Sequence, residues 1–126
     1  MVVYLPKERL VATGDLLTAG PAYLGDGYFT EWLATLDALK ALDFETVLPG
    51  HGDAFKGKAK IDHFQAYLRD FWTQAQELHK ARVAAEDAAK RIDMRTHAVN
   101  YPTITQPGVN VHGVLRAYEF LDGKIK

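Results

Sequence analysis

The sequence predicts an α/β fold. Two strands are expected at the N-terminus, followed by a helix and a third strand, and the second half is mainly helical. An order of strand, helix and strand is typical of a sheet covered by helices. The composition agrees, because 126 residues with 48% hydrophobic and 25% charged side chains are typical of a globular protein with one core.

A β-hairpin is predicted over residues 2–13. Residues 2–5 are β-branched, aromatic or apolar and favour a strand, and residues 9–13 favour a second strand. Between them, Pro6 presets the backbone angle of a turn. The hairpin ends at Gly14-Asp15, where a glycine followed by a short polar side chain is typical of a strand end.

A long loop and then a helix and a strand follow the hairpin. Residues 16–28 contain three glycines and one proline, and loops of this length are usually functional. Thr30 is the expected N-cap of a helix of about 13 residues, because the next apolar residues repeat at helical spacing, as Trp32, Leu36 and Leu39. Residues 44–48 form a short apolar strand that stops at Pro49-Gly50-His51-Gly52.

The second half is predicted to be helical. Apolar residues recur there at spacings of three and four, as Ile61, Phe64, Leu68, Phe71, Ala75 and Leu78, which predicts a helix over residues 59–80. A second helical piece is expected over residues 84–92, and residues 96–109 look irregular. A last helix is expected from Val111, with Gly123 as its C-terminal cap and a strand as the alternative.

One domain is expected over residues 1–126, in which residues 1–55 carry the candidate site and residues 56–126 are mainly helical. The absence of cysteine excludes disulfides, zinc–cysteine clusters and a thiol nucleophile. With 15 basic against 16 acidic residues, nothing indicates a nucleic-acid or membrane partner. Residues 1–6 have no basic leader, and no stretch approaches the ~20 apolar residues of a membrane span. We therefore expect a soluble protein. Its compartment is open, with the cytoplasm favoured over secretion, because a secreted chain without its signal peptide would look the same.

Two loops carry residues that can bind a metal ion. Asp15 follows one predicted strand and His51 follows another, and both residue types are good ligands of divalent ions. Neighbouring glycines let the backbone turn sharply at these points. Because ligands in open α/β sheets gather beyond the carboxyl ends of strands, we expect Asp15 and His51 to lie close together at one sheet edge. Read alone, each residue also fits an ordinary turn.

Three segments carry a resemblance to a known family. They are Val3-Tyr4-Leu5-Pro6, Leu10-Val11-Ala12-Thr13-Gly14-Asp15-Leu16-Leu17 and Val47-Leu48-Pro49-Gly50-His51-Gly52. They resemble the C-terminal half of the metallo-β-lactamase-fold hydrolases, a superfamily that includes glyoxalase II-like thioesterases. The resemblance implies one half of a four-layer αββα sandwich. It also implies that Asp15 bridges two metal ions and that His51 is a ligand of the second.

The function that this resemblance implies is metal-dependent hydrolysis of an ester, thioester, amide or phosphoester bond by a metal-bound hydroxide. The metal would be zinc, with iron or manganese as alternatives. The family's His-x-His-x-Asp-His segment is absent from this sequence. It needs two histidines separated by a single residue, and no two of the remaining histidines have that spacing: His63, His79, His97 and His112. We therefore expect a truncated domain that binds metal weakly or not at all and is inactive by itself.

A missing half would leave one face of the sheet bare. We expect a homodimer or larger homo-oligomer, or a separate N-terminal half, to cover that face. The alternative function is a non-catalytic, self-associating binding or assembly module. Tyr23, Tyr28 and His112 are weaker candidates for substrate binding, because the two tyrosines follow Asp15 in its loop and His112 follows an irregular segment.

Overall fold

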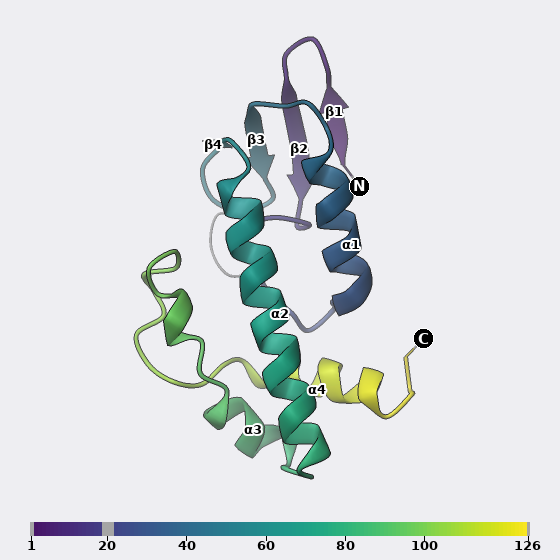
Figure 1. The fold of residues 1–126 in the computed structure, drawn as a ribbon, viewed down its shortest axis with the longest axis vertical. Coiled ribbons are helices and arrows are strands. Elements are labelled where there is room, and N and C mark those ends of the chain that lie inside the picture. The colour runs from purple at the N-terminus through teal and green to yellow at the C-terminus, as the bar shows by residue number, and fades with distance from the viewer. Residues whose placement is uncertain (1, 19–21, 126) are drawn as a thin grey trace. The chain divides into compact units, whose positions relative to one another are not determined.

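The computed structural model describes residues 2–18 and 22–125 (Figure 1). Strands alternate with helices in the first half, and helices make up the second half, which confirms the predicted α/β class. The chain folds as two compact units. Unit 1 holds the described residues of 1–22 and 30–65, and unit 2 holds 23–29 and the described residues of 66–126.

Unit 1 contains a four-stranded sheet. Its strands are β1 (Val3–Leu5), β2 (Leu10–Gly14), β3 (Thr46–Pro49) and β4 (Phe55–Lys56), and they lie side by side in this order. The predicted hairpin is present as the antiparallel pair β1–β2. The next pair, β2–β3, is parallel, so both of these strands end at the same edge of the sheet. The short strand β4 pairs antiparallel with β3 and was not expected from the sequence.

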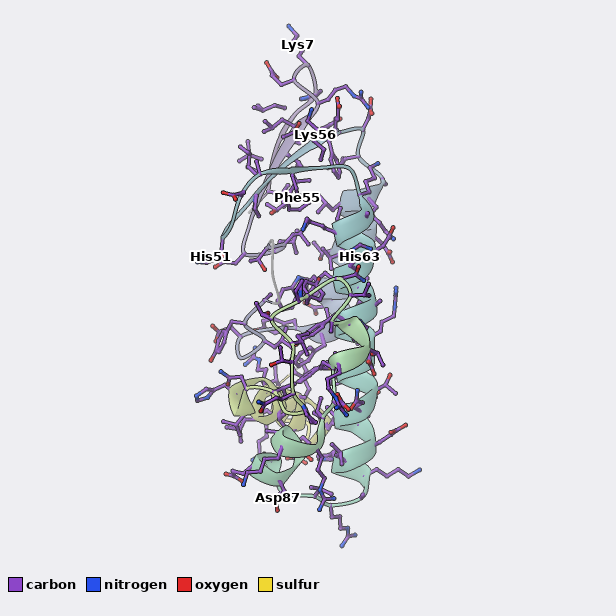
Figure 2. The ribbon with its side chains drawn as sticks, turned by 90° about the vertical axis from the view of Figure 1, so that its left-hand side faces the viewer. Lys7, His51, Phe55, Lys56, His63 and Asp87 are labelled. Atoms are coloured by element: carbon purple, nitrogen blue, oxygen red, sulfur yellow. The ribbon has the colours of Figure 1, made fainter. Side chains whose placement is uncertain are left out.

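The core of unit 1 joins the sheet to two helices. α1 (Phe29–Lys40) begins one residue before the expected cap Thr30, which therefore lies inside the helix, and α2 runs over Ala59–Lys80 as expected. Figure 2 shows the first turns of α2 on one side of the sheet. The core side chains are at most 3% exposed and come from the sheet and from both helices: Val11, Val47, Leu36, Leu39, Ile61 and Phe64.

Unit 2 consists of the rest of α2 with two shorter helices. α3 (Ala85–Arg91) lies within the predicted range, and α4 (Val111–Leu121) confirms the helix rather than the strand at the C-terminal end. The Asn110 side chain caps α4 by accepting a hydrogen bond from the His112 backbone N–H at 2.8 Å. Between α3 and α4 the chain is irregular except for a short 3₁₀ turn, η1 (Arg95–His97).

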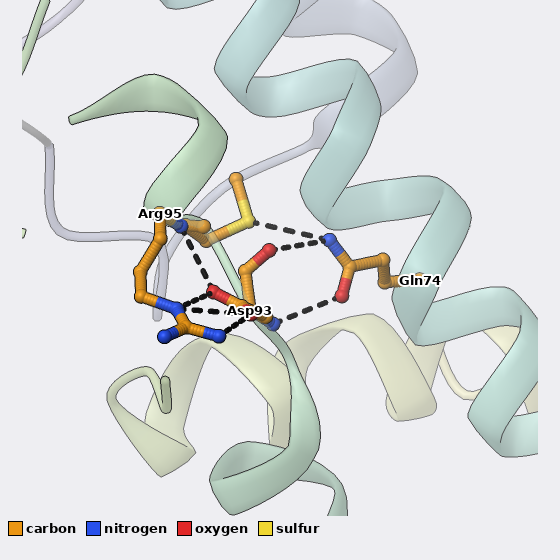
Figure 3. A network of polar contacts seen from close by, with 4 residues as sticks. Gln74, Asp93 and Arg95 are labelled. Carbon is orange, nitrogen blue, oxygen red and sulfur yellow. Dashed lines mark hydrogen bonds and ion pairs between the residues drawn. The ribbon is translucent and has the colours of Figure 1, made fainter. Parts of the chain in front are cut away.

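A polar network holds the segment after α3 against α2 (Figure 3). The Gln74 amide donates to the Asp93 carbonyl oxygen and accepts from the Asp93 backbone N–H, both at 3.0 Å. Asp93 in turn binds the Arg95 guanidinium at 2.8 Å, and hydrogen bonds from Arg95 lower the pKa of Asp93 to about 2. The Gln74 side chain thus supplies hydrogen-bond partners for both the N–H and the carbonyl group of Asp93, which lies outside regular secondary structure.

Among the described residues, no helix combines the length and the apolar character that crossing a membrane requires.

Candidate metal site

The two candidate ligands stand just beyond neighbouring strand ends. β2 ends at Gly14, which pairs with Pro49, the last residue of the parallel strand β3. Asp15 follows one residue after the first of these ends, and His51 follows two residues after the second. Gly14 has a φ of 54°, a left-handed conformation that glycine adopts without strain, so the chain turns sharply there.

Asp15 and His51 face each other. Asp15 Oδ1 lies 3.0 Å from His51 Nδ1, and each side chain is 78% exposed. In Figure 2, His51 lies on the loop between β3 and β4. This contact confirms the prediction that Asp15 and His51 come together at one sheet edge. The role of Asp15 and His51 as metal ligands stays a prediction.

Gly50 makes this close approach possible. Its backbone N–H donates to the Gly14 carbonyl oxygen at 2.8 Å, which ties the second loop to the first. A Cβ atom on residue 50 would meet Asp15 Oδ1 and would lie 2.6 Å and 2.7 Å from the carbonyl carbon and oxygen of Gly14. Only glycine therefore fits at this position without moving the backbone.

Two further residues fix the turn that carries Asp15. The hydroxyl of Thr13, which is 1% exposed, donates to the Leu17 carbonyl oxygen at 3.1 Å. The Trp32 indole N–H, on α1, donates to the Leu16 carbonyl oxygen at 2.8 Å. Sequence reasoning treated Trp32 only as part of the apolar stripe. The available signal was its indole N–H, which usually has a hydrogen-bond partner when the ring is buried.

The pair fits part of a metal site. Two donors that each lie about 2.0–2.2 Å from one ion, at neighbouring corners of its coordination shell, are roughly 3 Å apart. The separation of 3.0 Å between Asp15 and His51 agrees with that geometry. The described residues contain no group of three or more His, Cys, Asp or Glu side chains that could hold an ion. This chain's described residues therefore offer two donors, one fewer than a catalytic zinc site takes from protein.

The weaker candidates for substrate binding lie in unit 2, beside α4. The centroids of the Tyr23 and His112 rings are 6.4 Å apart. The Arg116 Cζ atom lies over the Tyr28 ring, 4.9 Å from its centroid. Arg116 also donates to the Gly27 carbonyl oxygen at 2.9 Å, which fixes the loop on the helix. Both tyrosines are exposed, Tyr23 by 57% and Tyr28 by 45%. Their part in substrate binding stays a prediction.

Comparison with known proteins agrees with the resemblance. Residues 1–51 match the family model of the metallo-beta-lactamase superfamily. The chain is 25% identical over 126 residues to the 2,4-dinitroanisole O-demethylase subunit alpha of Nocardioides sp. (strain JS1661), over 80% of this chain and 38% of that protein. It is 23% identical over 133 residues to the linear primary-alkylsulfatase of Pseudomonas sp. (strain ATCC 19151), over 94% of this chain and 25% of that protein.

The chain thus spans well under half the length of these curated relatives. Together the matches confirm its resemblance to the metallo-β-lactamase superfamily. The four-stranded sheet with its helices is consistent with part of that fold.

Proposed function

We propose that this chain contributes Asp15 and His51 to the metal site of a metal-dependent hydrolase of the metallo-β-lactamase type. One observation carries the proposal. The two side chains are far apart in the sequence, yet they meet at 3.0 Å beyond the ends of two parallel strands. Both lie within the segment that matches the superfamily, residues 1–51. The resemblance to this superfamily supports a hydrolase-type function.

The two residues have distinct tasks in this proposal. The Asp15 carboxylate and the His51 imidazole would hold a divalent ion, with zinc as the first choice and iron or manganese as alternatives. Such an ion supplies Lewis acidity and lowers the pKa of a water molecule toward neutrality. The Asp15 Oδ1 atom would give the ion a negative charge and the His51 Nδ1 atom a neutral nitrogen donor, and these two atoms lie 3.0 Å apart.

Their supports keep this geometry in place before any ion binds. Thr13 and Trp32 hold the turn around Asp15, and the Gly50 N–H holds the His51 loop to Gly14. A preorganised site costs less to order when it binds its ligand. The proposed substrates are ester, thioester, amide and phosphoester bonds, and the relative named as an alkylsulfatase supports a bond-cleaving reaction of this broad kind.

The chain alone is proposed to be inactive. A catalytic zinc site takes three protein ligands and keeps one position open for water, whereas the described residues bring two donors together. Both donors are also 78% exposed, so solvent competes for the ion. Further ligands would have to come from another segment or polypeptide.

The test is an assay of hydrolysis with and without a source of those ligands. The purified chain is assayed on a generic ester and a generic thioester with zinc present. It is then mixed with a polypeptide that carries a His-x-His-x-Asp-His segment, taken from a longer relative. We expect no turnover from the chain alone and turnover in the mixture that a chelator abolishes.

Two variants make the assay specific. His51→Ala should remove the turnover of the mixture, whereas His63→Ala, a change on α2, should leave it in place. Turnover that survives His51→Ala, or chelator-sensitive turnover by the chain alone, would contradict the proposal.

A further inference from the structure

A cleft in unit 2 lies between α3 and the segment that leads into α4. Its volume is about 590 Å³, which is within the range of small-molecule sites. Glu86, Ala89 and Lys90 line the cleft from α3, and residues 107–111 form the opposite wall. None of the residues that line it belongs to the candidate metal site, so an inference about this cleft does not depend on the proposed function.

Backbone hydrogen bonds hold the two walls of the cleft together. The Gly108 N–H donates to the Ile92 carbonyl oxygen at 2.8 Å, and the Val109 N–H donates to the Ala89 carbonyl oxygen at 2.8 Å. Gly108 has a φ of 107°, a conformation that glycine adopts without strain. The walls are therefore in place before a ligand arrives, and a preformed site costs less to order on binding.

Two opposite charges line the cleft, one helical turn apart on α3. Glu86 precedes Lys90 by four residues, a spacing at which the two side chains could pair with each other. In the structure, neither side chain makes an ion pair or a hydrogen bond with any of the described residues. The cleft therefore presents a carboxylate and an ammonium group that are both available to a ligand.

The opposite wall adds an amide group and an apolar surface. The Asn110 side-chain oxygen accepts a hydrogen bond from the His112 backbone N–H at 2.8 Å, which fixes the orientation of the amide. Its amide nitrogen donates to no other described residue, so two N–H donors remain for a ligand. The apolar surface of this wall consists of Pro107, Val109 and Val111.

We infer that this cleft binds a small zwitterion, an α-amino acid with an aliphatic side chain. The ammonium group of the ligand pairs with Glu86, its carboxylate accepts hydrogen bonds from Lys90 and Asn110, and its side chain lies on the apolar surface of residues 107–111. A simple anion would be repelled by Glu86 and a simple cation by Lys90, whereas a zwitterion matches both charges. Because Glu86 and Lys90 are exposed, each ion pair is weak, and we expect a dissociation constant in the millimolar range.

Titration with L-leucine, monitored by NMR of the backbone amides, tests the inference. The signals of Gly108, Val109 and Val111 should shift, and the signal of Gly57, which belongs to unit 1, should not. Two analogues of leucine lack one charge each, because isocaproate has no ammonium group and isoamylamine has no carboxylate. Each analogue should bind about threefold more weakly than leucine, the effect of one exposed ion pair. Cleft signals that leucine leaves unchanged up to its solubility, or an analogue that binds as tightly as leucine, would overturn the inference.

Substitutions on α3 test the two charges separately. Glu86→Gln should weaken leucine binding about threefold and strengthen isocaproate binding, because it removes the repulsion between two carboxylates. Lys90→Gln should weaken the binding of both ligands. The matched control is the next pair along the helix, Asp87→Asn and Arg91→Gln, which has the same spacing and is also exposed but does not line the cleft. The control variants should bind leucine like the wild type. Unchanged leucine binding by Glu86→Gln and Lys90→Gln, or an equal loss in the controls, would contradict the inference.

Discussion

The Asp15 carboxylate occupies the space that a side chain on residue 50 would need. A Cβ atom there would also lie 2.6 Å from the carbonyl carbon of Gly14, closer than real Cβ contacts come. Gly50→Ala must therefore push the two loops apart. We expect this change to lower the free energy of unfolding by about 2–3 kcal/mol, in the range of overpacking substitutions, and to separate Asp15 from His51. Denaturant titration measures the loss.

Gly57→Ala is the matched control for that change. Gly57 has a φ of 83° and no atom within 4 Å of the position of a Cβ, so alanine there costs only backbone strain, about 1 kcal/mol. The comparison separates a steric clash from a conformational cost. If Gly50→Ala is no more destabilising than Gly57→Ala, the close packing of the two loops is not what the structure indicates.

Trp32 should act on the Asp15 turn through its indole N–H. Trp32→Phe keeps an aromatic ring against Phe64, at 5.2 Å in the native pair, but removes the hydrogen bond to the Leu16 carbonyl oxygen. We expect a loss of about 1 kcal/mol in the free energy of unfolding and weaker zinc binding. Trp72→Phe is the control. The Trp72 ring stacks on Phe29, and its replacement should leave zinc binding unchanged. Equal zinc binding by all three proteins would rule out the positioning role of Trp32.

Two buried tyrosines predict a loss of stability at high pH. Burial raises the pKa of Tyr101 from 10.0 to about 12, and burial also raises the pKa of Tyr67, whose ring lies 5.5 Å away. The folded state keeps these protons after the unfolded chain has released them. The stabilisation is therefore complete below pH 10 and falls as the pH rises from 10 toward 12.

Denaturant titrations at several pH values measure this dependence, and ultraviolet absorbance follows the ionisation of tyrosine. In Tyr101→Phe the alkaline loss should be smaller than in the wild type, because one raised pKa is gone. If the free energy of unfolding falls by the same amount at high pH in both proteins, Tyr101 is not the cause.

Sequence periodicity predicted the long elements because their spacing records which side is buried. α2 runs over Ala59–Lys80, the predicted range, since its apolar residues recur every three or four positions over about five turns. β4 was not predicted, because a strand of two residues is too short to show the alternation of apolar and polar residues by which a strand is recognised. It exists because the chain returns along β3, where the Gly57 N–H donates to the Glu45 carbonyl oxygen at 2.8 Å. That contact depends on tertiary structure.

In the candidate site, too, some features could be predicted from the sequence and others depend on tertiary structure. Asp15 and His51 could be paired from the sequence, because each follows a strand and a glycine and because parallel strands end at one edge. The supports from Thr13 and Trp32 could not be found this way. Their hydrogen bonds join a turn to itself and to a helix, and neither spacing nor residue type specifies the acceptor.

Zinc titration monitored by NMR of the His51 imidazole tests the central claim most directly. We predict that zinc shifts the His51 signals with a dissociation constant weaker than micromolar, as suits a site with two exposed donors. Asp15→Ala should abolish the response, and the His63 signals should not move in the same concentration range. A His51 signal that zinc leaves unchanged, or an unaltered response in Asp15→Ala, would contradict the assignment of the two residues to one metal site.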